Sequence, residues 1–149
     1  MKMSELVYRS ARNSDFANVM DLWRKSFGDF GVTLDTAETL FYDLGTRTDV
    51  ASRDGDVVGI AMVRVVSGWA ELACIAVTPS LHGKGVAEVL LDRCHQYCQR
   101  KCLQEVSLHT LDGSSRAKSF FLKNGYKIVP GRLQYPKGQW ACRMAVKLS

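Results

Sequence analysis

Residues 74–87 read CIAVTPSLHGKGVA, an apolar strand pattern that runs into a proline and a glycine-rich turn. Pro79 cannot donate to a strand ladder, so it ends the strand. From Val86 on, apolar residues recur at helical spacing, which predicts a helix directly after Gly85. The first N–H groups of a helix have no partners inside it, and its dipole is positive there. The stretch therefore predicts an anion site between strand and helix.

This turn matches neither of the common phosphate-binding motifs. GxxxxGK[ST] is absent, and Gly83-Lys84-Gly85 lacks the last glycine of GxGxxG, although Ala87 follows. The strand, turn and helix by themselves do not name the ligand.

Two tight turns precede the strand. Asp54-Gly55 and Ser67-Gly68 separate apolar runs at 50–53, 57–66 and 69–77. Such dipeptides readily adopt the positive φ of hairpin turns. We expect three antiparallel strands in series.

The N-terminal part predicts a strand at 6–9 and two helices. Asn13 or Ser14 caps the first helix, whose apolar residues begin at Phe16. Asp35 and Glu38 resemble a capping box that opens the second helix, which should end near Gly45.

The C-terminal part predicts a strand at 105–111, a short helix and two closing strands at 126–129 and 140–148. Ser114 or Ser115 caps the short helix, which ends at Asn124-Gly125. The order of elements predicts an α/β fold in a single domain over residues 1–149, with a mixed, mostly antiparallel sheet and helices on both faces.

The charges divide unevenly along the 149 residues. Residues 1–77 carry 8 Lys and Arg against 11 Asp and Glu, whereas residues 78–149 carry 12 against 4. A basic half suits a polyanionic partner, which includes nucleic acid, a membrane surface or a phosphate-rich cofactor. A merely solvated surface explains the charge equally well.

Five cysteines without a CxxC pair predict reduced thiols. Cys94, Cys98 and Cys102 would lie along one helical stripe, but adjacent turns of one helix seldom complete a tetrahedral site, so we expect no metal. The first residues lack the apolar run of a signal peptide, and the stretch 57–63 is too short to cross a bilayer. We expect a cytoplasmic protein with no membrane association.

Two segments resemble the Gcn5-related N-acetyltransferase (GNAT) family. Its acetyl-CoA segment has the pattern Gln/Arg-x-x-Gly-x-Gly/Ala, which Gly85 and Ala87 match, with His82 in place of Gln or Arg. Residues 114–126 resemble the family's Asn-x-x-Ala-x-x-x-Tyr-x-x-x-Gly-Phe helix. There Ala117 and Gly125 match, while Ser, Phe and Tyr stand at positions 114, 121 and 126.

The resemblance implies an acetyl-CoA-dependent N-acetyltransferase with a bulged fourth strand, here 69–77, that splays from the fifth. The pantetheine arm would lie in the opening, where the N–H of Ile75 or Val77 would stabilise the oxyanion. The diphosphate would rest on main-chain amides from Gly83 to Glu88. The residues that the resemblance assigns to acetyl-CoA are Ile75, Ala76, Val77, His82, Gly83, Lys84, Gly85, Val86, Ala87, Glu88, Ser114, Ala117, Phe121 and Lys123.

Proton transfer needs further groups, because an amine of pKa roughly 10 is mostly protonated at neutral pH. Glu71 is the leading candidate base, since its spacing from the bulge is that of the Gcn5-like enzymes; a rim carboxylate is the alternative. Phe121 replaces the family's tyrosine acid, which leaves Tyr126, Tyr135 or solvent. His109 is a reserve candidate as base or substrate contact.

The leading hypothesis is direct transfer from acetyl-CoA to an amine in a ternary complex, in a monomer or homodimer. The acceptor would enter between the N-terminal helices and the last strands, where acidic residues favour a cationic amine. These residues are Asp29, Asp35, Glu38 and Asp43. The alternative is a non-catalytic acyl-CoA sensor, because residues 114 and 121 depart from the pattern. Nucleic-acid binding is not expected, because aromatic motifs do not interleave with the basic residues.

Overall fold

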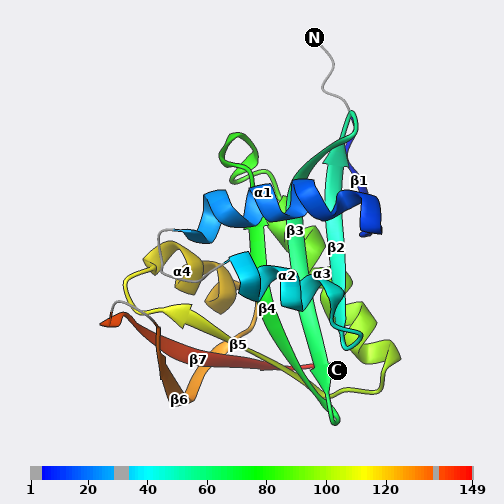
Figure 1. Ribbon diagram of the computed structural model, residues 1–149. Coiled ribbons are helices and arrows are strands. Elements are labelled where there is room, and N and C mark those ends of the chain that lie inside the picture. The colour runs from blue at the N-terminus through cyan, green and yellow to red at the C-terminus, as the bar shows by residue number, and fades with distance from the viewer. Residues whose placement is uncertain (1–4, 29–33, 136–137, 149) are drawn as a thin grey trace.

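The computed structural model describes residues 5–28, 34–135 and 138–148, without the side chains of Leu34 and Asp35, and shows one sheet flanked by helices (Figure 1). The seven strands lie in the order β1-β2-β3-β4-β5-β7-β6. Only β4 and β5 pair in parallel; the other neighbours are antiparallel. The predicted mixed, mostly antiparallel sheet is confirmed. The strands are β1 (Val7–Ser10), β2 (Thr46–Arg53), β3 (Asp56–Val66), β4 (Trp69–Val77), β5 (Glu105–Leu111), β6 (Lys127–Gln134) and β7 (Trp140–Lys147).

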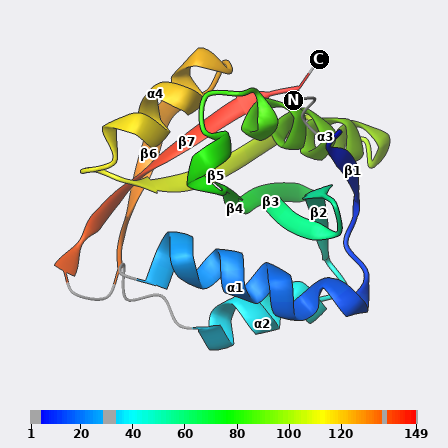
Figure 2. The ribbon, with the colours of Figure 1, turned by 90° about the horizontal axis from the view of Figure 1, so that it is seen from above.

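Helices cover both faces of the sheet, as predicted (Figure 2). One face carries α1 (Phe16–Phe27) and α2 (Leu34–Tyr42), and the other carries α3 (Val86–Arg100) and α4 (Ser115–Lys123). Each layer has its own apolar core. The core under α1 and α2 includes Val19, Trp23, Ile60 and Met62. The core under α3 and α4 includes Leu90, Leu91, Val106, Leu108 and Tyr126.

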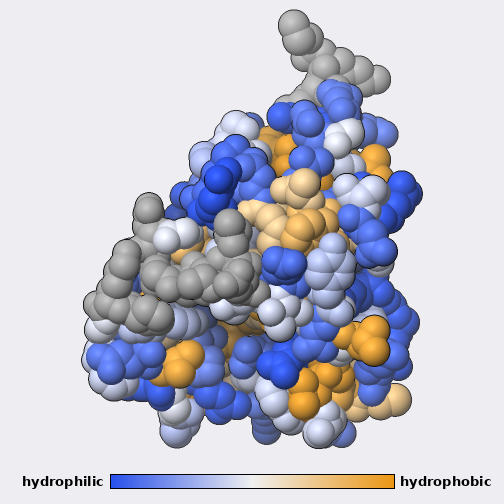
Figure 3. Space-filling view, in the orientation of Figure 1, coloured by the Kyte–Doolittle hydropathy of each residue, from blue (hydrophilic) through white to orange (hydrophobic). Residues whose placement is uncertain are grey.

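The surface of the α1 and α2 face is mixed in character. Its hydrophobic colour is broken into separate patches among hydrophilic residues (Figure 3). The apolar stripe of α1, with Val19 and Trp23, is buried against the sheet. Among the described residues, no helix has both the length and the apolar character needed to cross a bilayer.

Both predicted hairpin turns are confirmed. Asp54 and Gly55 have φ of 53° and 84°, and Ser67 and Gly68 have φ of 48° and 85°. Two consecutive residues with positive φ are what a two-residue turn between right-twisted strands requires.

Strand β2 begins four residues before the predicted start. These four residues are polar, and one of them, Asp49, belongs to a buried ion cluster. Asp49 is fully buried, and its carboxylate accepts hydrogen bonds from Arg47 of β2 and Arg93 of α3 at 3.2 Å each. Read locally, these polar residues do not look like a strand. Their burial depends on a helix that lies far away in the sequence.

Strand β6 extends past its predicted end, whereas β7 ends at Lys147, one residue before its predicted end. β6 continues through Pro130 and Gly131 to Gln134, because a register shift between Val129 and Arg132 accommodates both residues. Proline is tolerated there since β6 is an edge strand.

Two predicted helix caps are wrong. Asn13 and Ser14 lie in a 3₁₀ turn, and Asp15 occupies the N-cap position of α1. Its carboxylate makes no capping bond to α1 and instead accepts the N–H of Arg12 at 2.7 Å and a bidentate bond from Arg9. α2 already includes Leu34, so Asp35 lies inside the helix rather than at its cap.

Candidate active site

Strand β4 carries the predicted bulge. Met62 of β3 lies opposite Cys74, but the next residue, Val63, lies opposite Leu72. Ala73 is therefore the extra residue on β4, which bends the strand at this point.

Beyond the bulge, β4 and β5 diverge. Their ladder pairs only Ala70 with Val106 and Glu71 with Ser107. Thr78 donates its N–H to the carbonyl of Val58 on β3 at 2.9 Å. Since main-chain groups alternate along a strand, the N–H groups of Ile75 and Val77 point to the opposite side, toward β5. The opened edge thus presents two main-chain donors.

A cleft of about 720 Å³ opens at this edge. It runs from β4 across the turn before α3 to α4, and the end of α1 forms a further wall. Thirteen of the residues predicted to contact acetyl-CoA line it: Ile75, Ala76, Val77, His82, Gly83, Gly85, Val86, Ala87, Glu88, Ser114, Ala117, Phe121 and Lys123. Lys84 does not line the cleft, although both its neighbours do.

The turn before α3 is built for main-chain recognition. Gly83 and Gly85 have φ of 76° and 84° and stand on either side of Lys84. A Cβ on either glycine would meet nothing within 4 Å, so backbone conformation and not space requires glycine here. The first bond of α3 runs from the N–H of Val89 to the carbonyl of Gly85. The preceding helix N–H groups therefore have no helix partner and lie at the cleft.

A hydrogen bond from His82 joins this turn to the end of β4. Nε2 of the imidazole lies 2.7 Å from the carbonyl oxygen of Val77. A carbonyl only accepts, so Nε2 must carry the hydrogen. The N–H and carbonyl of Val77 point to the same side of β4, toward the opened edge. The imidazole of His82 therefore donates to a carbonyl at that edge.

The start of α4 departs from its prediction. Ser114 occupies the predicted N-cap position, but its side chain makes no capping bond. Phe121 is 6% exposed and packs edge-on against Phe120 and Tyr126. It presents to the cleft a ring that cannot donate a proton.

The two tyrosines considered as proton donors lie in different places. Tyr126 is 2% exposed in the core under α3, where its hydroxyl and Nε2 of His95 share a hydrogen bond of 2.7 Å. Because this hydroxyl is buried and already bonded to His95, the structure argues against the predicted role of Tyr126 as an acid. Tyr135 lies near Glu71: burial, and then the Glu71 carboxylate, raise the pKa of its phenol.

Glu71 lies on β4 just before the bulge. Alternating burial along β4 places it on the same face as Trp69, opposite the buried Ala70 and Leu72. His109 follows Ser107 by two residues on β5 and therefore shares this face. Glu71 and His109 thus lie on facing strands, but neither lines the large cleft.

The structure adds wall residues that the sequence did not indicate. Lys25, Ser26 and Phe27 at the end of α1 line the cleft, as do Arg116 and Ser119 of α4. The helical pattern of α1 showed only which residues are buried, so nothing local marked this end. Lys25, Arg116 and Lys123 outweigh Glu88, so the charged side chains of the cleft walls are net positive.

The acidic residues predicted near the acceptor are only partly described. Asp29 and the side chain of Asp35 lie outside the described residues. Glu38 is exposed on α2. Asp43 accepts the N–H of Gly45 at 2.8 Å and lies 3.6 Å from Arg64, so it is already partnered.

The predicted stripe of three thiols on α3 is wrong, since the helix ends at Arg100 and Cys102 is exposed beyond it. Burial raises the pKa of Cys74 to about 12 and that of Cys98 to about 11, and it also raises the pKa of Cys94. These three cysteines are thiols at neutral pH and not nucleophiles.

The model of the acetyltransferase (GNAT) family matches residues 16–126. The chain belongs to this family. The matched region spans α1, the bulged β4, the turn and α4, which are the parts that form the cleft. No curated protein matches this GNAT chain in a comparison of sequences.

Solved structures share the GNAT fold at low sequence identity. Ard1 from Thermoplasma volcanium matches with a TM-score of 0.85 and 21% identity, over 97% of this chain and 98% of that one. The ribosomal-protein-S18-alanine N-acetyltransferase from Escherichia coli matches with a TM-score of 0.84 and 17% identity, over 97% and 95%. An aminoglycoside 6'-N-acetyltransferase complexed with coenzyme A matches with a TM-score of 0.81 and 15% identity, over 96% and 97%. These neighbours act on different acceptors, so the GNAT fold does not name the acceptor here.

Proposed function

We propose that this GNAT chain is an N-acetyltransferase that moves an acetyl group from acetyl-CoA to an amine. One observation carries the proposal: the opened edge of β4 continues directly into the turn and N-terminus of α3 within one cleft. Such a cleft suits a ligand with an amide-bearing arm at one end and phosphates at the other.

The groups along the cleft fit coenzyme A in this order. The N–H groups of Ile75 and Val77 can pair with the amides of the pantetheine arm as a strand would. The main-chain amides from Gly83 to Glu88 suit the diphosphate, because unpartnered N–H groups and the helix dipole attract negative charge. Lys25, Arg116 and Lys123 supply positive charge beside them.

The transfer is an attack of the acceptor nitrogen on the thioester carbonyl carbon. A C–N bond forms and the C–S bond breaks, so the amine loses a proton and the sulfur gains one. Glu71 takes the proton from the amine, directly or through water. An N–H of Ile75 or Val77 donates to the oxygen that becomes negative, an interaction typically worth about 3 kcal/mol.

We assign the proton on the sulfur to Tyr135. Phe121 cannot donate, and the hydroxyl of Tyr126 is buried and bonded to His95. Tyr135 does not line the large cleft either, but it lies near Glu71, the proposed base. A phenol is protonated at neutral pH, as a proton donor requires, and burial and the Glu71 carboxylate raise the pKa of Tyr135 further.

A non-catalytic acyl-CoA sensor is the second candidate. Phe121 favours it, because this residue replaces the usual acid with a ring that only packs. The two candidates agree on binding of coenzyme A and differ in turnover.

The test measures binding first, by calorimetry with coenzyme A and acetyl-CoA, and then release of free thiol with a panel of amines. Gly85→Ala is the informative variant, because it strains the turn at the proposed diphosphate site. Gly55→Ala is its matched control: Gly55 has the same φ of 84° and equally open surroundings, but lies in the β2–β3 hairpin.

We expect both variants to lose about 1 kcal/mol of stability, because an alanine at this φ is strained. Only Gly85→Ala should weaken coenzyme A binding, by about tenfold or more. Absence of heat with wild-type protein would refute binding, and binding without thiol release for any amine would favour the sensor.

A further inference from the structure

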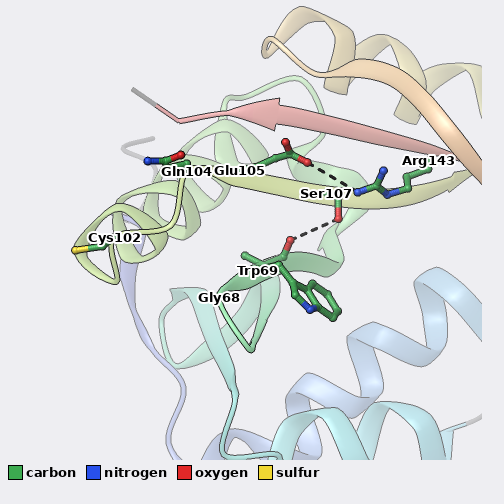
Figure 4. Close-up of a pocket in the computed structure, with 8 residues that line it drawn as sticks. Gly68, Trp69, Cys102, Gln104, Glu105, Ser107 and Arg143 are labelled. Atoms are coloured by element: carbon green, nitrogen blue, oxygen red, sulfur yellow. Dashed lines mark hydrogen bonds and ion pairs between the residues drawn. The ribbon is translucent and has the colours of Figure 1, made fainter.

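A second pocket, of about 300 Å³, lies at the other end of β4 (Figure 4). We call it the Trp69 pocket. Its side-chain walls are Trp69, Cys102, Gln104, Glu105, Ser107 and Arg143, and it shares no residue with the large cleft. In Figure 4 the indole of Trp69 and the guanidinium of Arg143 lie on opposite sides of an open space.

The candidate base lies between the two pockets along β4. Gly68, Trp69 and Ala70 line the Trp69 pocket, and Ile75 to Val77 line the large cleft. Glu71 comes between them and shares its face with Trp69, about 7 Å along the strand. A molecule in the Trp69 pocket could therefore place an amine at Glu71 while the thioester approaches from the other side.

Within the described part of the chain, Ser107, Arg143 and Glu105 of the Trp69 pocket have only distant polar partners. The hydroxyl of Ser107 lies 3.5 Å from the carbonyl oxygen of Ala70, and Nη1 of Arg143 lies 3.5 Å from that of Pro130. Nη2 of Arg143 lies 3.8 Å from Oε1 of Glu105. All three distances exceed the usual range of a hydrogen bond, so donors and acceptors remain for a ligand.

The charge of the pocket argues for a ligand body without net charge. Arg143 and Glu105 carry opposite charges, and their side chains lie 3.8 Å apart. A charged group of the ligand would therefore lie close to a side chain of the same charge, whether it were an ammonium or a carboxylate. Trp69 is 47% exposed and offers a flat apolar surface. An extended peptide is disfavoured, because β4 and β5 are paired at Ala70 and leave no free strand edge there.

We propose that the Trp69 pocket binds the hydroxyl-rich ring of the acceptor, and that the acceptor is an amino sugar. Each hydroxyl both donates and accepts, which matches Arg143, Ser107 and Glu105, while the C–H face of the ring packs on Trp69. The proposal rests on the proposed N-acetyltransferase function, since it assigns the acceptor of the same reaction.

The experiment compares three acceptors with acetyl-CoA: glucosamine, putrescine and the tripeptide Ala-Ala-Ala. Wild-type protein and two variants are assayed for kcat/KM, and coenzyme A binding is measured by calorimetry. Trp69→Ala removes the proposed platform. Trp140→Ala is the matched control, since Trp140 is similarly exposed, at 45%, but alternation along β7 places it on the opposite face from Arg143.

We expect glucosamine to have the highest kcat/KM. Trp69→Ala should raise the KM for glucosamine about tenfold without changing coenzyme A affinity, and Trp140→Ala should change neither. Preference for putrescine or the peptide, no turnover of glucosamine by protein that binds coenzyme A, or an unchanged KM in Trp69→Ala each overturns this inference alone. Wild-type protein that fails to bind coenzyme A would instead refute the proposed function.

Discussion

Nε2 of His82 donates a hydrogen bond of 2.7 Å to the carbonyl oxygen of Val77. The bond joins the end of β4 to the turn that leads into α3. It therefore fixes the main-chain donors of the turn relative to those of the opened strand, which are the two halves of the proposed acetyl-CoA site.

Removing this bond should weaken the diphosphate half of the site. We expect His82→Ala to reduce coenzyme A affinity about tenfold, while affinity for pantetheine, which lacks the diphosphate, stays unchanged. His82→Gln should recover much of the loss, because its amide can donate to the same carbonyl. Calorimetry with both ligands checks this, and an equal loss for pantetheine would contradict it.

The second prediction concerns Glu71. Glu71→Gln keeps the size of the side chain but removes the base, so kcat should fall about a hundredfold with little change in coenzyme A binding. Part of the lost rate should return at alkaline pH, where more of the amine is already neutral. Glu5→Gln, at an exposed position before β1 and outside both pockets, is the control. Equal activity of Glu71→Gln and wild type would exclude Glu71 as the base.

The third prediction separates the two tyrosines. Tyr135→Phe should lower kcat tenfold or more, because it removes the proposed donor to sulfur. Tyr126→Phe should leave kcat unchanged but cost about 1 kcal/mol of stability, because it removes the hydrogen bond to the half-buried His95. Thiol-release assays and urea unfolding measure the two effects. The reverse pattern would show that the assignment is wrong.

The fourth prediction is a pH dependence of stability. Burial lowers the pKa of His95 from its ordinary 6.5, with partial opposition from Asp92. The unfolded chain therefore binds a proton that the folded chain refuses, so the free energy of unfolding falls as pH drops below about 6.5. The loss levels off once the pH is below the lowered pKa of the folded state.

His95→Gln should flatten this dependence between about pH 7 and pH 5, and urea unfolding at several pH values measures it. An unchanged slope in the variant would assign the pH dependence to other groups.

Much of the framework was readable from local patterns. β4 and β5 have the predicted bounds, and both hairpin turns lie where Asp54-Gly55 and Ser67-Gly68 placed them. Thirteen of the fourteen residues that the family resemblance assigned to acetyl-CoA line the cleft, because the glycine turn and the α4 segment are contiguous motifs. Periodicity and turn chemistry act within a few residues, so the sequence displays them directly.

The predictions that were wrong, and the site residues that were missed, depend on contacts between segments far apart in the chain. The carboxylate of Asp49 is buried within β2 in an ion pair with Arg93 of α3. The hydroxyl of Tyr126 is bonded to His95 in the core and does not reach the cleft. Likewise, Lys25 reaches the cleft only because α1 crosses the sheet beside β4. The sequence by itself determined the order of the elements and the GNAT resemblance, which in turn implied the bulge in β4. Only the tertiary structure decided which side chains meet, since burial and charge pairing depend on packing between distant segments.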